Sequence, residues 1–597
     1  MGFIARLLAV IPYHLYIALL GLVCYANTLG NGFVFDDSAY LTSALVRNPA
    51  IGDLLLTNWL GLDIYRPLTL LSLGLDFSLY QETPLGYHLS NLVLHLINGV
   101  LLYKLARDLL GEDHAALWAA LLYVSHPIQT EVVAWVSARG DLLGTLFFLC
   151  AFLAHRRDLW RWRIAAWILY GAAVLSKETA LVLPGVLFLQ TWYMDRSEES
   201  RTVFLWTWIK SNFGYGVVLL AALVLRWLAL ADSSAPTGPA STNFLADLDT
   251  WQRIGTIVAI LPRYLLLLVV PRHLSADYSY ASIPPITSLV DPWFAFGVLS
   301  IAVFVILSRY TRSRFFYFIG LFFWICLLPV SNLFFLAPSG MAERYLHLAM
   351  IPVSLMAGWG GWQGAKWATR RGAWAAILCL VVMFAVGTVS RNRDWHSDVS
   401  LFSAVLRHYP ENARAHDNLG FAYYQQGQYV QAIHHYQKAV AIQPTRLRAL
   451  FNLGLLYIQS RRYDEAVTLF KTALSVYPNH VESHFNLGLT YQKTRRYEQA
   501  IGHYLSVLSL QPGHLKAYYN LGRAYERVDR PEAAIEQYTA LIGLDGNASK
   551  AYYRLGEVYY AQQRYQEMAS AWTTLLRLQP YHREGERIRR LLQQIYR

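Results

Sequence analysis

Asn452-Leu453-Gly454 and Asn486-Leu487-Gly488 lie in the last third of the chain, and their first residues are 34 positions apart (486 − 452 = 34). The same spacing connects them to three more tripeptides, Asn418-Leu419-Gly420, Asn520-Leu521-Gly522 and Arg554-Leu555-Gly556. Sequence that repeats at a fixed period of this length indicates an array of stacked structural units rather than one globular core.

A period of 34 residues is that of the tetratricopeptide repeat (TPR), a hairpin of two helices. Helix-ending residues recur in phase at Pro410, Pro444, Pro478, Pro512, Gly546 and Pro580,. Small residues recur where paired helices must approach closely, at Ala432, Ala466, Ala500 and Ala534. Such arrays form a superhelix whose concave face commonly receives an extended peptide. The repeat predicts the fold of this region and says little about its ligand.

The rest of the chain has the composition of a membrane protein. Of the 597 residues of the whole chain 55% are hydrophobic, and the mean hydropathy of the chain is +0.27. The net charge of +12 comes from basic residues in short loops between apolar segments and from residues scattered through the repeats, so we expect no nucleic-acid partner,. The four cysteines lie in apolar stretches, which argues against disulfides and thiolate metal sites,.

Apolar segments predict about eleven membrane spans, beginning with a retained signal anchor at about Leu7 to Tyr25,. Their centres lie near Ala18, Asn98, Leu121, Phe148, Ala172, Leu187, Leu219, Val303, Phe322, Leu355 and Leu380. We interpret Arg253 to Val270 as re-entrant or interfacial, because an additional crossing would put the basic cluster at Arg309 on the wrong side,. The predicted fold is all-α: a polytopic helix bundle over residues 1–390, followed by a TPR superhelix over residues 391–597.

Basic residues also predict the orientation. Lys104 and Arg107, the cluster from Arg156 to Arg163, and two further basic loops mark alternate connections as cytoplasmic,. The first loop, from Asn27 to about Pro84, then lies on the opposite, exoplasmic side, as do the repeats. We expect an integral membrane protein of a bacterial inner membrane, with its site and its repeats on the periplasmic side.

Asp36 and Asp37 follow the first span in Asn31-Gly32-Phe33-Val34-Phe35-Asp36-Asp37. Adjacent carboxylates beside lipid are costly unless they are solvated, paired or functional. One of them could accept the proton of a hydroxyl group that attacks a sugar, which is general-base catalysis. The alternative is that Asp36 caps a helix or solvates a loop.

Other ionisable residues occur at predicted span ends on the same side: His126, Glu131, Arg139, Lys177, Glu178, Glu343 and Arg344. Arginine and lysine suit a lipid phosphate and can stabilise its charge as it leaves. Each could equally be a membrane anchor or half of a structural ion pair, and His126, before Pro127, could simply end a helix. The sequence contains no spacing typical of a metal site, no phosphate-binding glycine loop and no serine nucleophile motif,.

In this order, several of these motifs resemble the TMTC proteins, transmembrane and TPR-containing O-mannosyltransferases of the GT-C glycosyltransferase superfamily. The resemblance covers nearly the whole chain. It rests on the Asn31–Asp37 stretch, Arg66-Pro67-Leu68, Gly86-Tyr87-His88-Leu89-Ser90-Asn91, His126-Pro127-Ile128-Gln129-Thr130-Glu131, Ser176-Lys177-Glu178-Thr179, Asp277-Tyr278-Ser279, Ala342-Glu343-Arg344-Tyr345 and Arg391-Asn392-Arg393-Asp394-Trp395.

The resemblance implies an inverting enzyme that takes a sugar, often mannose, from a polyprenyl-phosphate carrier and gives it to a hydroxyl of a protein or peptide that the repeats recruit. It maps the catalytic acids onto Asp36 and Asp37, the phosphate-binding residues onto Arg139, Lys177 and Arg344, and leaves supporting roles to Arg66, His126, Glu131, Glu178 and Glu343. A divalent metal is left open, since members of the superfamily differ. Two other interpretations remain: a transferase acting on a lipid-linked or envelope glycan, and a non-catalytic membrane scaffold.

Overall fold

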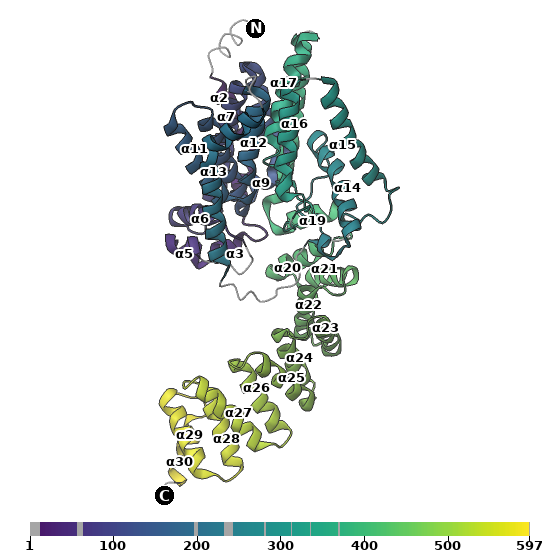
Figure 1. The fold of residues 1–597 in the computed structure, drawn as a ribbon. Coiled ribbons are helices and arrows are strands. Elements are labelled where there is room, and N and C mark those ends of the chain that lie inside the picture. Colours follow the sequence, from purple (N-terminus) through teal and green to yellow (C-terminus); the bar gives the residue numbers. More distant parts are fainter. Residues whose placement is uncertain are drawn as a thin grey trace. The chain divides into compact units, whose positions relative to one another are not determined.

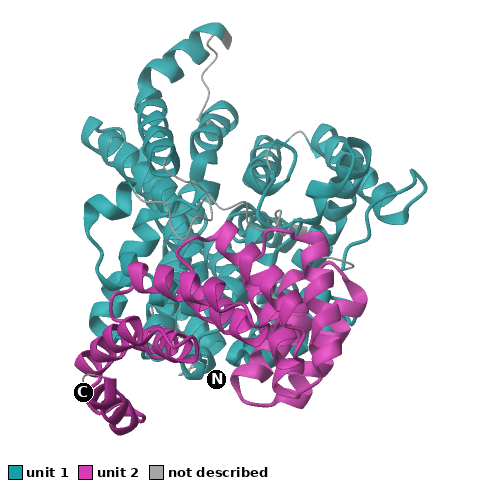
Figure 2. Ribbon diagram, turned by 90° about the horizontal axis from the view of Figure 1, so that it is seen from below, with its two compact units in different colours: residues 1–415 teal, residues 416–597 magenta. Residues whose placement is uncertain are grey.

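The computed structural model describes residues 12–56, 64–195, 201–231, 243–279, 282–311, 313–334, 336–367 and 370–595. The start of the expected signal anchor, from about Leu7, lies outside the described residues. Within these ranges the regular elements are all helices (Figure 1). The chain divides into two compact units, Met1–Ala415 and His416–Arg597 (Figure 2). Residues 391–415, which follow the last long apolar helix, therefore belong to the first unit.

The first unit begins with α2 (Tyr13–Tyr25), the short helices α3 (Asp37–Thr42), α4 (Ala44–Arg47) and α5 (Ile51–Leu56), and then α6 (Pro67–Tyr80). It continues with α7 (Pro84–Leu110), α8 (Asp113–Ser125), α9 (Thr130–Ala134), α10 (Arg139–His155), α11 (Trp160–Ser176), α12 (Leu183–Gln190) and α13 (Arg201–Ala231). Its last helices are α14 (Thr250–Val269), α15 (Pro292–Thr311), α16 (Arg314–Leu327), α17 (Met350–Trp367), α18 (Arg370–Asn392) and α19 (Asp398–His408).

Local sequence explains where these helices start and stop. Helix α7, which is 27 residues long, has Pro84 in its first turn, where the missing N–H is not needed,. It ends at Gly111, whose φ of 69° is the left-handed cap that glycine adopts without steric cost,. Several segments between the helices contain short 3₁₀ turns, such as η2 (Pro127–Gln129), η4 (Glu178–Val182) and η8 (Glu343–Leu346), and η4 and η8 carry ionisable residues of interest.

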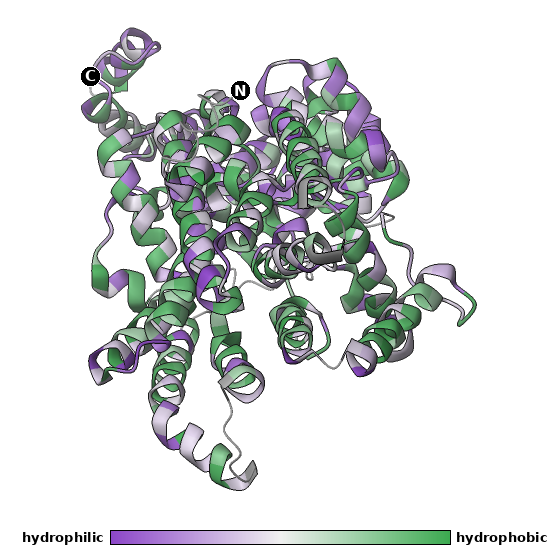
Figure 3. Cartoon of the chain, turned by 90° about the horizontal axis from the view of Figure 1, so that it is seen from above, coloured by the Kyte–Doolittle hydropathy of each residue, from purple (hydrophilic) through white to green (hydrophobic). Residues whose placement is uncertain are grey.

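Seven of the described helical segments are long and apolar enough to cross a membrane, and a shorter apolar segment covers Arg314–Val330. These seven segments correspond to the helices α2, α7, α10, α13, α14, α15 and α18. Large apolar side chains of α13 and α15, among them Trp227 and Phe296, are exposed, and hydrophobic residues run along the helices in Figure 3. A surface of this kind is suited to lipid, and the chain is an integral membrane protein. The predicted count of about eleven spans is not confirmed.

The segment from Arg253 to Val270 forms most of α14, one continuous helix that does not turn back on itself. One residue before α14 and one residue within it contact the same neighbouring segment. Asn243, before α14, donates a hydrogen bond to the Ala337 carbonyl (2.8 Å), and Tyr264, near its end, accepts one from the Ala342 N–H (3.3 Å). By length and hydropathy α14 qualifies as a span.

The two ends of the membrane part meet. The Gly32 N–H, just after the first span, donates to the His396 carbonyl (3.1 Å), and the Asn392 side chain, at the end of α18, donates to the Cys24 carbonyl (2.8 Å). The chain therefore leaves α18 at the same end of the bundle at which it left α2. This is the end that holds Asp36.

The second unit is the repeat array, and its helices alternate as the period predicts. After α20 (Ala413–Gln425), which starts at the end of the first unit, come α21 (Tyr429–Ile442), α22 (Leu447–Gln459), α23 (Tyr463–Val476), α24 (Val481–Lys493), α25 (Tyr497–Leu510), α26 (Leu515–Arg527), α27 (Pro531–Leu544), α28 (Ser549–Ala561), α29 (Tyr565–Leu578) and α30 (Gly585–Ile595).

The tripeptide of each repeat has a packing role. Its leucine is buried, as at Leu453 and Leu487. Its glycine faces an aromatic ring of the second helix of the same hairpin; a Cβ on Gly488 would come within 2.8 Å of the Tyr504 ring. Because there is no room for a side chain there, glycine is needed at this position. The sequence prediction of helical hairpins is confirmed.

Candidate active site

The loop that carries the two aspartates lies between the first and last long helices of the first unit. The Asn31 side chain donates to the carbonyl of Asn392 (3.4 Å), and the Phe35 N–H donates to the carboxylate of Asp398 at the start of α19 (2.7 Å). Residues more than 360 positions away in the sequence thus fix the backbone of this loop.

Asp37 is fully buried, and its carboxylate accepts three hydrogen bonds. They come from the Val34 N–H (3.0 Å), the Ser137 N–H (2.8 Å) and the Ser137 hydroxyl (2.5 Å). Burial raises the pKa of Asp37 to about 7, although the bonds from Ser137 and Val34 act in the opposite direction. With its acceptor positions occupied, Asp37 ties the loop to the turn before α10.

Asp36 is only partly buried, and it differs from its neighbour in its partners. Its Oδ1 atom is enclosed but has no hydrogen-bond partner among the described residues. Burial raises the pKa of Asp36, while Ser137, Arg344 and Arg414 lower it. A carboxylate with an unoccupied oxygen, close to two arginines, has the properties of a group that can accept a proton from a ligand.

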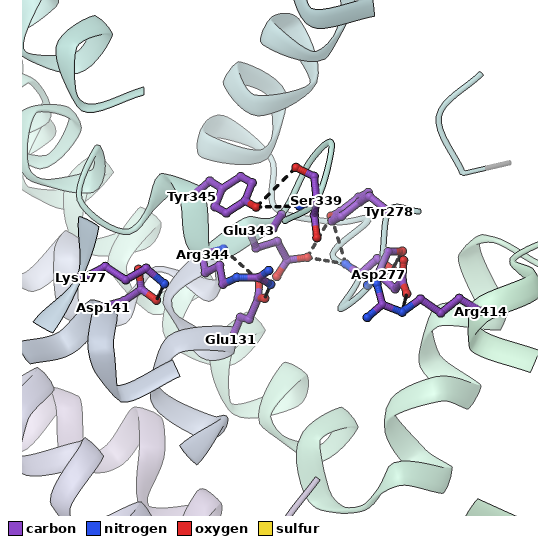
Figure 4. A network of polar contacts seen from close by, with 12 residues as sticks. Glu131, Asp141, Lys177, Asp277, Tyr278, Ser339, Glu343, Arg344, Tyr345 and Arg414 are labelled. Carbon is purple, nitrogen blue, oxygen red and sulfur yellow. Dashed lines mark hydrogen bonds and ion pairs between the residues drawn. The ribbon is translucent and has the colours of Figure 1, made fainter. Parts of the chain in front are cut away.

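Arg344 and Glu131 form a closely hydrogen-bonded ion pair next to this loop (Figure 4). Arg344 donates to Glu131 from its guanidinium Nη1 (2.6 Å) and from its backbone N–H (2.9 Å). Its guanidinium also lies over the rings of Trp135 and Tyr345, each 5.3 Å from the ring centroid. Glu131 is buried. Two elements far apart in sequence, α9 and η8, therefore hold this cation in place.

Two more ion pairs lie around the end of α11. Lys177 donates to Asp141 (2.8 Å), and both side chains are almost fully buried. Arg66 forms two hydrogen bonds with Glu178, at 2.6 and 3.0 Å, and its charge helps hold the pKa of that carboxylate well below its usual range despite burial. Glu178 keeps 39% of its side chain exposed, so this pair borders the surface.

Arg139 lies in the interior, with no exposed side-chain surface. It pairs with Asp76 (2.6 Å) and donates to the Asn91 side chain (2.8 Å) and the Tyr87 carbonyl (3.0 Å). A further donor reaches Ser72. These partners belong to α6 and α7, so Arg139 joins three helices.

Glu343 and His126 are also buried. Glu343 accepts hydrogen bonds from the Tyr278 hydroxyl (2.9 Å) and from the Ser275 N–H, and burial raises its pKa to about 8, with Arg391 acting against this shift. The His126 ring lies 3.2 Å from the Ile128 N–H and 3.0 Å from the Leu268 carbonyl. Its contacts are those of a histidine at a helix end.

Several residues of this region were not singled out from the sequence. They are the partner acids Asp76 and Asp141, the loop ligand Ser137, and the later residues Asp398 and Arg414; Asp277 was part of a quoted motif but was given no role. Asp277 pairs with Arg414 (3.3 Å), and both lie close to the Glu343 and Arg344 segment (Figure 4). One sequence signal could have identified a member of this set: Asp141 follows Arg139 by two residues, in the same turn of a helix that begins at a loop.

Among the described residues no group of three or more His, Cys, Asp or Glu has an arrangement that could hold a metal ion. The carboxylates of Glu131, Asp141 and Glu178 each face an arginine or a lysine instead. The charges of this region are therefore organised as cation–carboxylate pairs, and the cations of two pairs, Arg344 and Arg414, act on Asp36.

Comparison with known proteins agrees with the motifs. The family described as dolichyl-phosphate-mannose-protein mannosyltransferase matches residues 67–229, and that described as protein O-mannosyl-transferase TMTC, DUF1736, matches residues 233–306. Tetratricopeptide repeat families match three stretches within 411–545, and residues 519–582.

Curated relatives are similar over the same region. Mouse protein O-mannosyl-transferase TMTC3 is 28% identical over 469 residues, which are 70% of this chain and 50% of the relative. The Caenorhabditis elegans protein O-mannosyl-transferase F38B6.6 is 28% identical over 448 residues, 71% of this chain and 62% of the relative. The chain spans about half the length of the mouse relative. In its membrane part and in its repeats, the chain is similar to the TMTC proteins.

Proposed function

We propose that the chain is an inverting membrane glycosyltransferase that moves mannose from a polyprenyl-phosphate carrier to a serine or threonine hydroxyl of a protein. The observation that carries the proposal is Asp36, a partly buried carboxylate with an unpaired oxygen among fixed cations. The names of the similar families and relatives, which describe protein O-mannosyltransferases, support the same reaction.

In this mechanism Asp36 is the general base. The acceptor oxygen bonds to the sugar C1 as the bond from C1 to the phosphate oxygen breaks, which inverts the configuration at C1. The hydroxyl proton passes to Asp36, and the polyprenyl phosphate leaves. A raised pKa makes Asp36 a stronger base than an ordinary aspartate, because a catalytic base works best when its pKa approaches the operating pH,. Asp37 keeps the loop in position through Ser137.

Lys177 and Arg344 are the residues we assign to the leaving phosphate, with Arg66 beside them. Each is held by a carboxylate from another element, so its position is set before the donor binds, and a fixed charge is most effective where new charge develops,. Lysine has three donor hydrogens, and Lys177 directs one of them to Asp141,. Arg139, with its partners all internal, is assigned to holding α6, α7 and α10 together.

We assign the site to the exoplasmic side, periplasmic in a bacterium. The basic clusters predicted to be cytoplasmic belong to the opposite ends of the same helices: α10 begins at Arg139 beside the site and ends at His155, just before Arg156,. The chain leaves α18 at the end that holds Asp36 and continues into the repeats. Repeats on this side would raise the local concentration of acceptor segments.

The test is transfer by the purified full-length protein. It is incubated with polyprenyl-phosphate mannose labelled in the sugar and with peptides rich in serine and threonine, and the products are read by mass spectrometry. The proposal expects peptides heavier by one hexose at a hydroxyl residue. Label that appears only on a lipid-linked glycan would reassign the acceptor, and label that stays on the donor with every acceptor would contradict the proposed reaction.

A further inference from the structure

Phe35, the residue before Asp36, has an unusual backbone conformation. Its φ is 60°, in the left-handed region that side chains other than glycine rarely adopt,. In the first unit the other described non-glycine residues with positive φ are Gln81 and Asn332. Phenylalanine has no polar side chain that could favour this conformation through a local hydrogen bond. Contacts from elsewhere in the fold must therefore hold it.

Those contacts come from the segment after α18. The Phe35 N–H donates to Asp398 Oδ1 (2.7 Å). The ring of Phe35 packs against Phe402 on the same helix, α19, with centroids 5.8 Å apart, and the guanidinium of Arg414 lies 5.3 Å from its centroid. The ring of Phe35 also contacts the ring of Trp135, with centroids 5.4 Å apart.

Asp398 is itself fixed in place. It is the first residue of α19, and Ser397 and Ser400 form a reciprocal capping box around it,. An aspartate in a first helical turn is ordinarily explained by the positive end of the helix dipole alone. Here the carboxylate is partly buried and also accepts the Phe35 N–H, so it makes a bond that the helix does not require.

We propose that Asp398 is a positioning residue for the reaction: it holds Phe35 in the left-handed conformation that directs the Asp36 carboxylate toward the cations. The inference rests on the proposed role of Asp36 as the base. It means that membrane helices do not set the position of the base alone. The segment that continues into the repeats takes part, through α19.

The first test is a double-mutant cycle in the full-length protein. Asp398→Ala should lower kcat by about 10- to 100-fold and leave the KM for polyprenyl-phosphate mannose within about twofold, because a misplaced catalytic group affects the chemical step. Phe35→Gly removes the steric cost of a positive φ. In that background Asp398→Ala should change kcat by less than about twofold. Asp398→Asn keeps an oxygen acceptor and should retain more activity than the alanine variant.

The second test does not require mannose transfer. Hydrogen–deuterium exchange in detergent should be faster in peptides covering residues 31–37 of Asp398→Ala than of the wild type. Asp464→Ala, which changes an exposed aspartate in the first turn of α23, is the matched control and should leave both readouts unchanged. An Asp398→Ala protein with wild-type exchange in this loop would overturn the inference, whether or not the protein transfers mannose. Equal losses of kcat on adding Asp398→Ala to the wild type and to the Phe35→Gly variant would overturn it as well.

Discussion

Several ion pairs of the first unit are buried, whereas many of those in the repeats are exposed, with the pairs of the buried Asp417 as an exception. In the first unit the pairs Lys177–Asp141 and Arg344–Glu131 are largely buried and join segments far apart in sequence. In the repeats the pairs Arg462–Glu465 and Arg564–Glu567 are three residues apart and exposed. Exposed pairs contribute little to stability, whereas a buried charge is costly unless its partner is present. The difference agrees with the proposed role of the first unit's charges in the transfer reaction.

Breaking a buried pair should have the largest effect. Glu131→Gln leaves the charge of Arg344 without its carboxylate and should cost about 3–5 kcal/mol of stability. It should also abolish transfer, because Arg344 would no longer be held beside Asp36. Thermal unfolding in detergent measures the first effect. Glu465→Gln, which breaks an exposed pair in α23, is the control and should leave the unfolding midpoint unchanged. Equal shifts in the two variants would remove the contrast between the units.

The stability of the repeats should depend instead on the volume of the side chains where two helices pack closely. Gly488→Ala puts a methyl group within 2.8 Å of the buried Tyr504 ring and should destabilise its hairpin by about 1–3 kcal/mol. Gly502, in α25, has nothing within 4 Å of an added Cβ. Gly502→Ala should therefore stabilise the same hairpin by up to about 1 kcal/mol, because alanine is the better helix former. Hydrogen exchange in peptides of α24 and α25 reports both effects, and the same sign for both substitutions would contradict this account of the tripeptide.

A smaller effect should appear on acidification, in two of the repeats. His416 and His435 face each other with Nδ1 atoms 3.0 Å apart, and His484 and His503 do the same. Burial and the facing histidine lower the pKa of His435 and of His503 to about 4. An unfolded histidine titrates near 6.5, so between about pH 6.5 and 4 the unfolded chain binds more protons. The stability of these hairpins should therefore fall as the pH falls through that window.

The second repeat offers the control for this prediction, since Leu450 and Leu469 occupy the positions of the histidine pair. Replacing His484 and His503 by leucine should reduce the pH dependence of the exchange-derived stability of α24 and α25 over the same window, leaving the contribution of His480, whose pKa burial also lowers. A pH dependence as large as that of the wild type would assign it to other groups.

The repeats could be predicted from the sequence because each hairpin packs mainly on its neighbours, so the 34-residue period already contains its contacts. The site could be predicted only in part. The motifs predicted roles for Asp36, Lys177 and Arg344, and these roles stay predictions. The pairing of Arg344 with Glu131 joins residues 213 positions apart and depends on how the helices pack. For the same reason the sequence could not show that Arg139 is buried and differs in this from Lys177 and Arg344. It also could not show that Asp37, and not Asp36, accepts the hydrogen bond of Ser137.

The rate of mannose transfer by Asp36→Asn tests most directly whether Asp36 is the base, and Asp37→Asn is measured beside it. Asparagine keeps the shape of the side chain and cannot act as the base. We expect Asp36→Asn to lose at least about 100-fold in kcat with an unchanged unfolding midpoint, and Asp37→Asn to lower the midpoint because Ser137 loses its carboxylate partner. Transfer by Asp36→Asn at the wild-type rate would contradict the account.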